Sequence, residues 1–145
     1  INKAKEIEGS IFSNCTKLTK AEIINVTDRI GQHLFDGCTA IESITLPFAG
    51  STLEEVNNAN STECLSQRLF KYPVTDKTYS TGNSGYIPYS LKKIEIKSGS
   101  RIPNSTFYGF SNVSEIILPD TITVISKSSF EIPTQVLGFP SSNNK

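Results

Sequence analysis

The sequence predicts a solenoid, a stack of short coils in which each coil contributes one short strand to a parallel sheet. Three observations lead to this fold class. Apolar residues recur with a period of 23 residues, each repeat holds one alternating apolar segment, and Pro, Gly and Asn stand at the corners. A unit this short cannot bury its apolar positions alone, so stacked units must share one core. We therefore expect a mainly β single domain over residues 1–145, with about five coils.

The period is visible at both ends of the chain. Phe12 and Phe35 are 23 residues apart, and Phe107 and Phe130 repeat this spacing. The stretch IGQHLFDGCTAIESITLP, Ile30 to Pro47, supplies the template I-x4-F-x2-C-x2-L-x2-I-x-L-P. The repeat therefore runs through most of the sequence rather than through one local motif.

Three apolar slots close each repeat, and their L-x2-I-x-L spacing is typical of a short strand with one face inward. Stacked in register, such strands form a parallel sheet with neighbours about 4.8 Å apart. The I-x4-F segment is expected to form the side of each coil opposite the strand, with its Phe pointing into the core. The short period leaves no room for a full helix on that side. The slots are filled by Leu18-Ala21-Ile23, Ile41-Ile44-Leu46, Leu91-Ile94-Ile96, Val113-Ile116-Leu118 and Val136-Phe139.

The third coil is longer than the others. The segment LSQRLF, Leu65 to Phe70, matches IGQHLF of the second coil, with Gln and Leu in the same places. Twelve extra residues precede this segment and fifteen follow it, which accounts for the 27 residues added to one period. We therefore expect two inserted loops in the third coil, at about residues 48–64 and 71–90.

Bulk properties exclude several classes of partner. The chain has 14 basic and 14 acidic residues, so no net field attracts nucleic acid or an anionic membrane. No apolar run approaches the length of a membrane span, and direct membrane insertion is not expected. No Met opens the chain and no signal peptide is visible, so we expect a piece of a longer protein.

His33 is the only histidine and stands five residues before Cys38. Such a pair can form a nucleophile with its base, or two metal ligands. The repeat separates the two residues, because Cys38 shares an inward slot with Cys15 while the His33 slot is typical of a solvent-facing position. The equivalents of His33 are Ser10, Arg68, Ser105 and Ser128.

No catalytic, metal or cofactor site is expected. The chain has no Cys-x2-Cys, no second His, no Asp-rich loop and no Gly-rich phosphate cradle. Cys15 and Cys38 are expected to pack as small thiols. Their oxidation to a disulfide stays open, because stacked neighbours come within disulfide range. Cys64 stands beside a long loop and has no partner in the repeat.

Two surfaces are candidates for binding. The outward positions of the strands form an extended face of the kind that solenoids use, although a solvated face of mixed charge explains it equally well. The tyrosines of the second insertion could supply contact area, or could instead pack the loop against the coils. The candidate residues are Lys20, Glu22, Lys92, Lys93, Glu95 and Glu115 on the strands, and Tyr72, Tyr79, Tyr86 and Tyr89 in the loop.

The repeat resembles the BspA-type leucine-rich repeat. The resemblance rests on IGQHLFDGCTAIESITLP and on IPNSTFYGFSNVSEIILPDTITVISKSSF, where Phe110 occupies the usual Cys position. The middle, from LPFAGS to YIPYSLKKIEI, is similar to an elaborated repeat in surface proteins of gut-type bacteria.

This resemblance implies a leucine-rich-repeat solenoid in a secreted or surface-attached bacterial protein, often an adhesin or protein-binding module. The implied partner is an extracellular protein or glycan, and the family brings no catalytic motif. Two other roles stay open: a spacer without a ligand, and a targeting module of a secreted enzyme whose catalytic domain lies outside this sequence.

Overall fold

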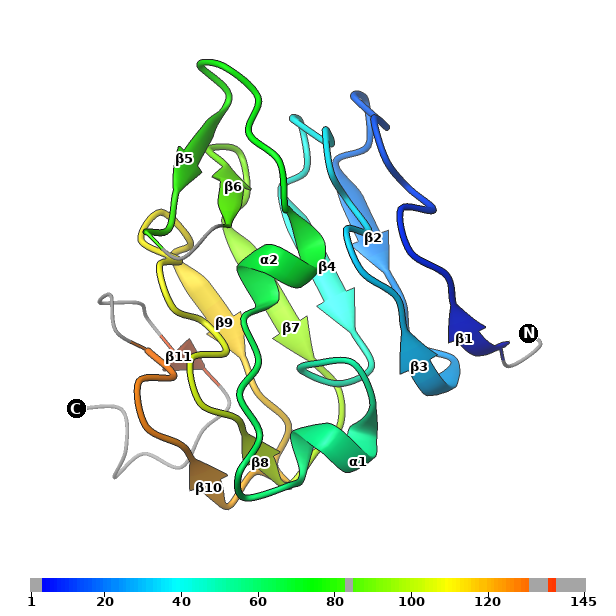
Figure 1. Cartoon of the computed structure of the whole chain (residues 1–145), viewed down its shortest axis with the longest axis vertical. Coiled ribbons are helices and arrows are strands. Elements are labelled where there is room, and N and C mark those ends of the chain that lie inside the picture. The colour runs from blue at the N-terminus through cyan, green and yellow to red at the C-terminus, as the bar shows by residue number, and fades with distance from the viewer. Residues whose placement is uncertain (1–3, 83–84, 131–135, 138–145) are drawn as a thin grey trace.

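The chain winds into a stack of coils, each of which adds one strand to the same parallel sheet (Figure 1). The computed structural model describes residues 4–82, 85–130 and 136–137. The five-stranded sheet has the order β11-β9-β7-β4-β2, which confirms the predicted solenoid. Its strands are β2 (Lys20–Glu22), β4 (Ser43–Leu46), β7 (Lys93–Ile96), β9 (Glu115–Ile117) and β11 (Val136–Leu137).

The register of this sheet follows the apolar slots of the repeat. Ala21 pairs with Ile44, Ile44 with Ile94, and Ile94 with Ile116. Each of these residues is the middle slot of its coil, and the three isoleucines are at most 1% exposed. The strand β4 pairs directly with β7 over four residues, so the long third coil rejoins the stack without a shift.

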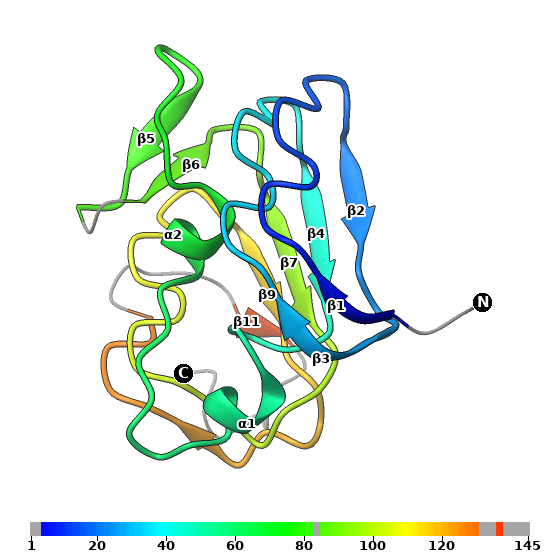
Figure 2. The ribbon, with the colours of Figure 1, turned by 45° about the vertical axis from the view of Figure 1, so that its right-hand side comes forward.

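A second layer lies on the opposite side of the stack (Figure 2). Here β1 (Ala4–Ile7) pairs with β3 (Val26–Ile30), and β8 (Arg101–Ile102) pairs with β10 (Val124–Ile125), both in parallel. In the third coil the helix α2 (Leu65–Leu69) takes the place of a strand, so this layer is split into two pairs. Helices in the described residues are only four or five residues long, as the short period predicts.

The two insertions add local structure of their own. The first holds α1 (Leu53–Val56), which begins at Thr52, where the side-chain oxygen accepts a hydrogen bond from the N–H of Glu55 at 3.0 Å. This contact satisfies one of the unpaired donors of the first helical turn. The second holds an antiparallel hairpin of β5 (Thr78–Ser80) and β6 (Tyr86–Pro88).

The core contains the phenylalanines that open each coil. The ring centroids of Phe12 and Phe35 lie 5.4 Å apart, those of Phe35 and Phe70 lie 6.3 Å apart, and those of Phe107 and Phe130 lie 5.1 Å apart. The N–H of Phe35 donates to the carbonyl of Leu69 at 3.0 Å. LSQRLF of the third coil therefore lies beside IGQHLF of the second, with Phe70 next to Phe35.

Candidate functional site

The outward side chains of the sheet form two rows across neighbouring strands. We call this surface the strand face. Its exposure varies, since Lys20 and Glu22 on the edge strand β2 are exposed, whereas Thr45 on the neighbouring strand β4 is only 9% exposed. The structure therefore brings most of the predicted strand residues together. The rows are Lys20, Ser43, Lys93 and Glu115, and then Glu22, Thr45, Glu95 and Ile117.

The charges of the strand face are balanced by near neighbours. Nζ of Lys20 lies 3.5 Å from Oε2 of Glu22 on the same strand. Lys93 stands directly opposite Glu115 in the sheet register, where opposite charges stabilise a strand pair. This surface presents charges of both signs rather than a field of one sign. It therefore suits a polar partner whose charges alternate in the complementary order.

Lys92 and Tyr89 lie at the corner that leads into β7. The carbonyl of Lys92 accepts hydrogen bonds from the N–H groups of Ser114 and Glu115, at 3.0 and 3.1 Å. These bonds hold the corner while the Lys92 side chain stays exposed. Tyr89 is 51% exposed, and its carbonyl accepts a hydrogen bond from Nδ2 of Asn112 at 2.9 Å. The corner thus extends the strand face at the end where its strands begin.

The tyrosines of the second insertion divide into different roles. The hydroxyl of Tyr79 accepts a hydrogen bond from the N–H of Asn112 at 3.0 Å, and its ring lies 5.1 Å from that of Tyr89. Burial raises the pKa of Tyr79, although the Asn112 contact opposes this rise. Tyr79 therefore anchors the hairpin to the fourth coil, whereas Tyr72 and Tyr89 are more than half exposed. Tyr86 is half-buried, and its N–H donates to the carbonyl of Phe70 at 2.9 Å.

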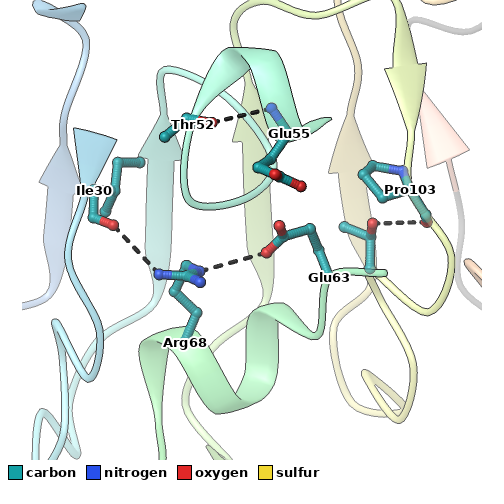
Figure 3. A network of polar contacts seen from close by, with 7 residues as sticks. Ile30, Thr52, Glu55, Glu63, Arg68 and Pro103 are labelled. Atoms are coloured by element: carbon teal, nitrogen blue, oxygen red, sulfur yellow. Dashed lines mark hydrogen bonds and ion pairs between the residues drawn. The ribbon is translucent and has the colours of Figure 1, made fainter. Parts of the chain in front are cut away.

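A largely buried ion pair joins Arg68 in α2 to Glu63, which lies just before this helix (Figure 3). Nε of Arg68 lies 3.5 Å from Oε1 of Glu63, and the two side chains are 17% and 8% exposed. Nη1 of Arg68 also donates to the carbonyl of Ile30 at 3.3 Å, which links the third coil to the second. Burial raises the pKa of Glu63, while the charge of Arg68 and a hydrogen bond from the Ser51 backbone lower it.

This pair borders a hollow of about 240 Å³ that the sequence reasoning missed. Gln32, His33, Gln67 and Lys71 line it together with Glu63 and Arg68. The only signal in the sequence was an acidic and a basic residue five positions apart beside an insertion, a pattern too common to single out. Arg68 itself was expected to face solvent, and the structure instead encloses most of its side chain.

The slot of His33 is defined by its backbone conformation more than by exposure. Ser10, His33, Ser105 and Ser128 all have positive φ angles, between 58° and 60°. The side chain of His33 is 26% exposed, its ring packs edge-on against Tyr72 at 5.5 Å, and Nδ1 lies 4.0 Å from Asp36. The description of this slot as simply solvent-facing is therefore incomplete.

Replacing His33 with valine is expected to lower the free energy of unfolding by about 1 kcal/mol, because a β-branched residue is strained at a positive φ that histidine adopts more readily. Replacing it with asparagine is expected to cost much less, because asparagine adopts this conformation readily. Both variants lose the contacts with Tyr72 and Asp36, so their comparison in urea denaturation isolates the backbone effect. Equal stability of the two variants would contradict it.

The cysteines do not form the reactive pair with His33 that their spacing in the sequence allows. Cys38 is 0% exposed, and its Sγ donates to the carbonyl of Phe12 at 2.9 Å. Burial raises the pKa of Cys38 to about 11, so almost none of it is thiolate at neutral pH. Cys15 lies beside it in the adjacent coil, and all three cysteines are thiols in the structure.

The described part of the chain holds neither a cluster of metal ligands nor a membrane-spanning helix. Residues 4–82, 85–130 and 136–137 contain no group of three or more His, Cys, Asp or Glu side chains arranged to hold a metal ion. Within the same residues, no helix has the length and apolar character needed to cross a membrane.

Comparison with known proteins supplies the family. A family model described as a BspA type leucine rich repeat region of 6 copies matches residues 1–82 and 48–139. No curated protein and no solved structure matches the chain. The two matched segments together cover nearly the whole sequence, and the observed strands follow the same repeat. The chain therefore belongs to the BspA-type leucine-rich repeat family.

Proposed function

We propose that this chain is a non-catalytic binding module of an extracellular or surface-attached bacterial protein, and that it serves adhesion to a protein or glycan ligand. The family is associated with bacterial surface proteins and with protein binding. The observation that carries the proposal is the strand face, whose side chains stand in two rows across neighbouring strands. Repeat proteins use extended surfaces of this kind for recognition.

The size of the strand face indicates that the second insertion takes part. Five strands at about 4.8 Å spacing, each about three residues long, span roughly 20 by 10 Å. A stable protein interface buries about 800 Å² on each partner, which is several times this footprint. Tyr89 and Lys92, just before β7, are the exposed side chains that would enlarge the contact. Exposed tyrosines supply contact area at low entropic cost.

The test is a binding screen against extracellular matrix proteins, mucins and glycans, followed by charge reversal of the strand face. Lys93→Glu is expected to lower the affinity for the bound partner at least tenfold, because it places a second acidic side chain opposite Glu115. Lys5→Glu, the same change on the exposed strand β1 of the other layer, is the matched control. Melting temperatures should show that both variants remain folded.

Two outcomes would contradict the proposal. If no member of the screen binds above background, the chain acts as a spacer. If Lys5→Glu and Lys93→Glu weaken binding equally, recognition does not occur on the strand face.

A further inference from the structure

The helix α2 lies across the stack from the sheet (Figure 2), and the hollow beside it is therefore separate from the strand face. We propose that it binds a terminal acidic sugar, with the sugar carboxylate at Lys71 and Arg68 and its hydroxyl groups at Glu63 and the two glutamine amides. This site is separate from the strand face, and the proposal does not depend on the function proposed above.

The size of the hollow limits its ligand to one small unit. Its volume of about 240 Å³ lies below the range of about 300–1,000 Å³ that is usual for drug-sized ligands. At about 30 Å³ for each water in the liquid, it holds the equivalent of roughly eight waters. A single sugar ring or one amino-acid side chain is of this size, whereas a nucleotide or a folded segment is not.

The charges around the hollow favour an anion. Among the side chains that line the hollow, Lys71 and Arg68 outnumber one carboxylate, Glu63, while Asp36 lies behind the lining, 4.0 Å from Nδ1 of His33. The backbone N–H of Lys71 is engaged by Oδ1 of Asp36 at 2.6 Å, but its ammonium forms no ion pair with the described residues. A ligand carboxylate placed beside this ammonium would complete the pairing.

The hydrogen-bonding groups of the ion pair are not saturated. Nε of Arg68 is buried and lies 3.5 Å from Glu63, yet it makes no hydrogen bond in the described residues. Nε itself is enclosed, so a ligand carboxylate in the hollow would meet the exposed part of the Arg68 guanidinium instead. When ionised, Glu63 offers acceptors and no donor, so a ligand hydroxyl can donate to it.

The combination of groups distinguishes a sugar acid from a peptide carboxylate. An aspartate or glutamate side chain would satisfy Lys71 but would bring a like charge towards Glu63 with no hydroxyl to donate. A sugar acid carries its carboxylate and its hydroxyl groups on one ring, so it can engage both sides of the hollow. Tyr72 packs against His33 beside the hollow and is 59% exposed, and it offers an aromatic surface to the ring.

The experiment titrates the purified chain with single sugars, followed by calorimetry and by ligand-observed NMR. The probes are glucuronic acid, galacturonic acid and N-acetylneuraminic acid, with glucose and free glutamate as comparisons. We expect saturable binding of at least one acidic sugar, at least tenfold tighter than that of glucose or glutamate. Equal binding of glutamate would assign the hollow to peptide carboxylates, and absence of saturable binding by every acidic sugar would also overturn the proposal.

Variants locate the binding within the molecule. Lys71→Gln keeps the backbone hydrogen bond to Asp36, so the fold should survive while affinity for the acidic sugar falls at least fivefold. Lys77→Gln, the same change at an exposed position before β5, should have no effect. Lys93→Glu should leave sugar binding unchanged, and Lys71→Gln should leave strand-face binding unchanged, so the two proposals fail separately. Equal losses in Lys71→Gln and Lys77→Gln would show that the hollow is not the site.

Discussion

Replacing Phe35 with alanine is expected to lower the free energy of unfolding by about 3–5 kcal/mol, the range for a fully buried phenylalanine. Phe35 is 0% exposed and lies between the rings of Phe12 and Phe70 in the adjacent coils. Its removal leaves a cavity that both neighbours border, and stacked coils obtain their stability from such contacts between neighbours. Urea denaturation followed by circular dichroism measures the change.

The matched control for this prediction is Phe12→Ala. Phe12 occupies the same slot of the first coil, but it is only half-buried and has a ring contact with Phe35 alone among the described residues. Its loss should therefore be clearly smaller than that of Phe35. A cost below about 1 kcal/mol for Phe35→Ala, or equal costs for both variants, would be incompatible with a shared core.

Replacing Arg68 with alanine is expected to lower the free energy of unfolding by about 3 kcal/mol at pH 7, because it leaves a buried carboxylate without its partner. This is the lower end of the range for buried pairs, since Arg68 retains 17% of its side-chain exposure while Glu63 retains 8%. The variant also removes the hydrogen bond to the carbonyl of Ile30. We therefore expect the first insertion and α2 to loosen from the second coil.

The effect of Arg68→Ala should depend on pH in a defined direction. Burial raises the pKa of Glu63 above its ordinary value of 4.5 in the folded state. The Glu63 carboxyl therefore contributes most to the free energy of unfolding below pH 4.5, where it is protonated in both states. This contribution falls as the pH rises through the folded-state pKa. Without Arg68 the folded-state pKa rises further, because the cation that opposes the rise is gone.

The gap in stability between wild type and Arg68→Ala should consequently be widest at neutral pH and narrow as the pH falls towards 4.5. Denaturation of both proteins at several pH values over this interval measures the gap. A Glu63→Gln background, in which the titrating group is absent, should remove the pH dependence. A gap that stays constant with pH in the wild-type background would contradict the buried, ionised state of Glu63.

The sheet could be predicted from the sequence because every coil needs an apolar residue at the same inward position, and these positions set the register. Ile44, Ile94 and Ile116 occupy equivalent inward slots, and each stacks only on its neighbours. The match of LSQRLF to IGQHLF located the third coil for the same reason, since Phe70 must reach Phe35. A periodic pattern thus carries information about every contact between one coil and the next.

The insertions could not be predicted in this way, because their contacts occur once. Arg68 reaches Ile30, Lys71 reaches Asp36, and Tyr79 reaches Asn112, all across 33 residues or more. None of these contacts has an equivalent in another coil that would reveal it. The hollow and the division of the tyrosines into anchoring and exposed side chains therefore emerged only from the structure. The rows of the strand face follow the register of the repeat, and their role in binding stays a prediction.

The direct pairing of β4 with β7 across the interrupted coil has an evolutionary consequence. Because the sheet closes over the third coil without a shift in register, loops at this position can change length and composition while the neighbouring coils keep their contacts. Variation in natural relatives should therefore concentrate in the two insertions, at about residues 48–64 and 71–90, as it does in loops carried by rigid scaffolds. The solenoid would then act as a conserved frame whose specificity diverges at a single coil.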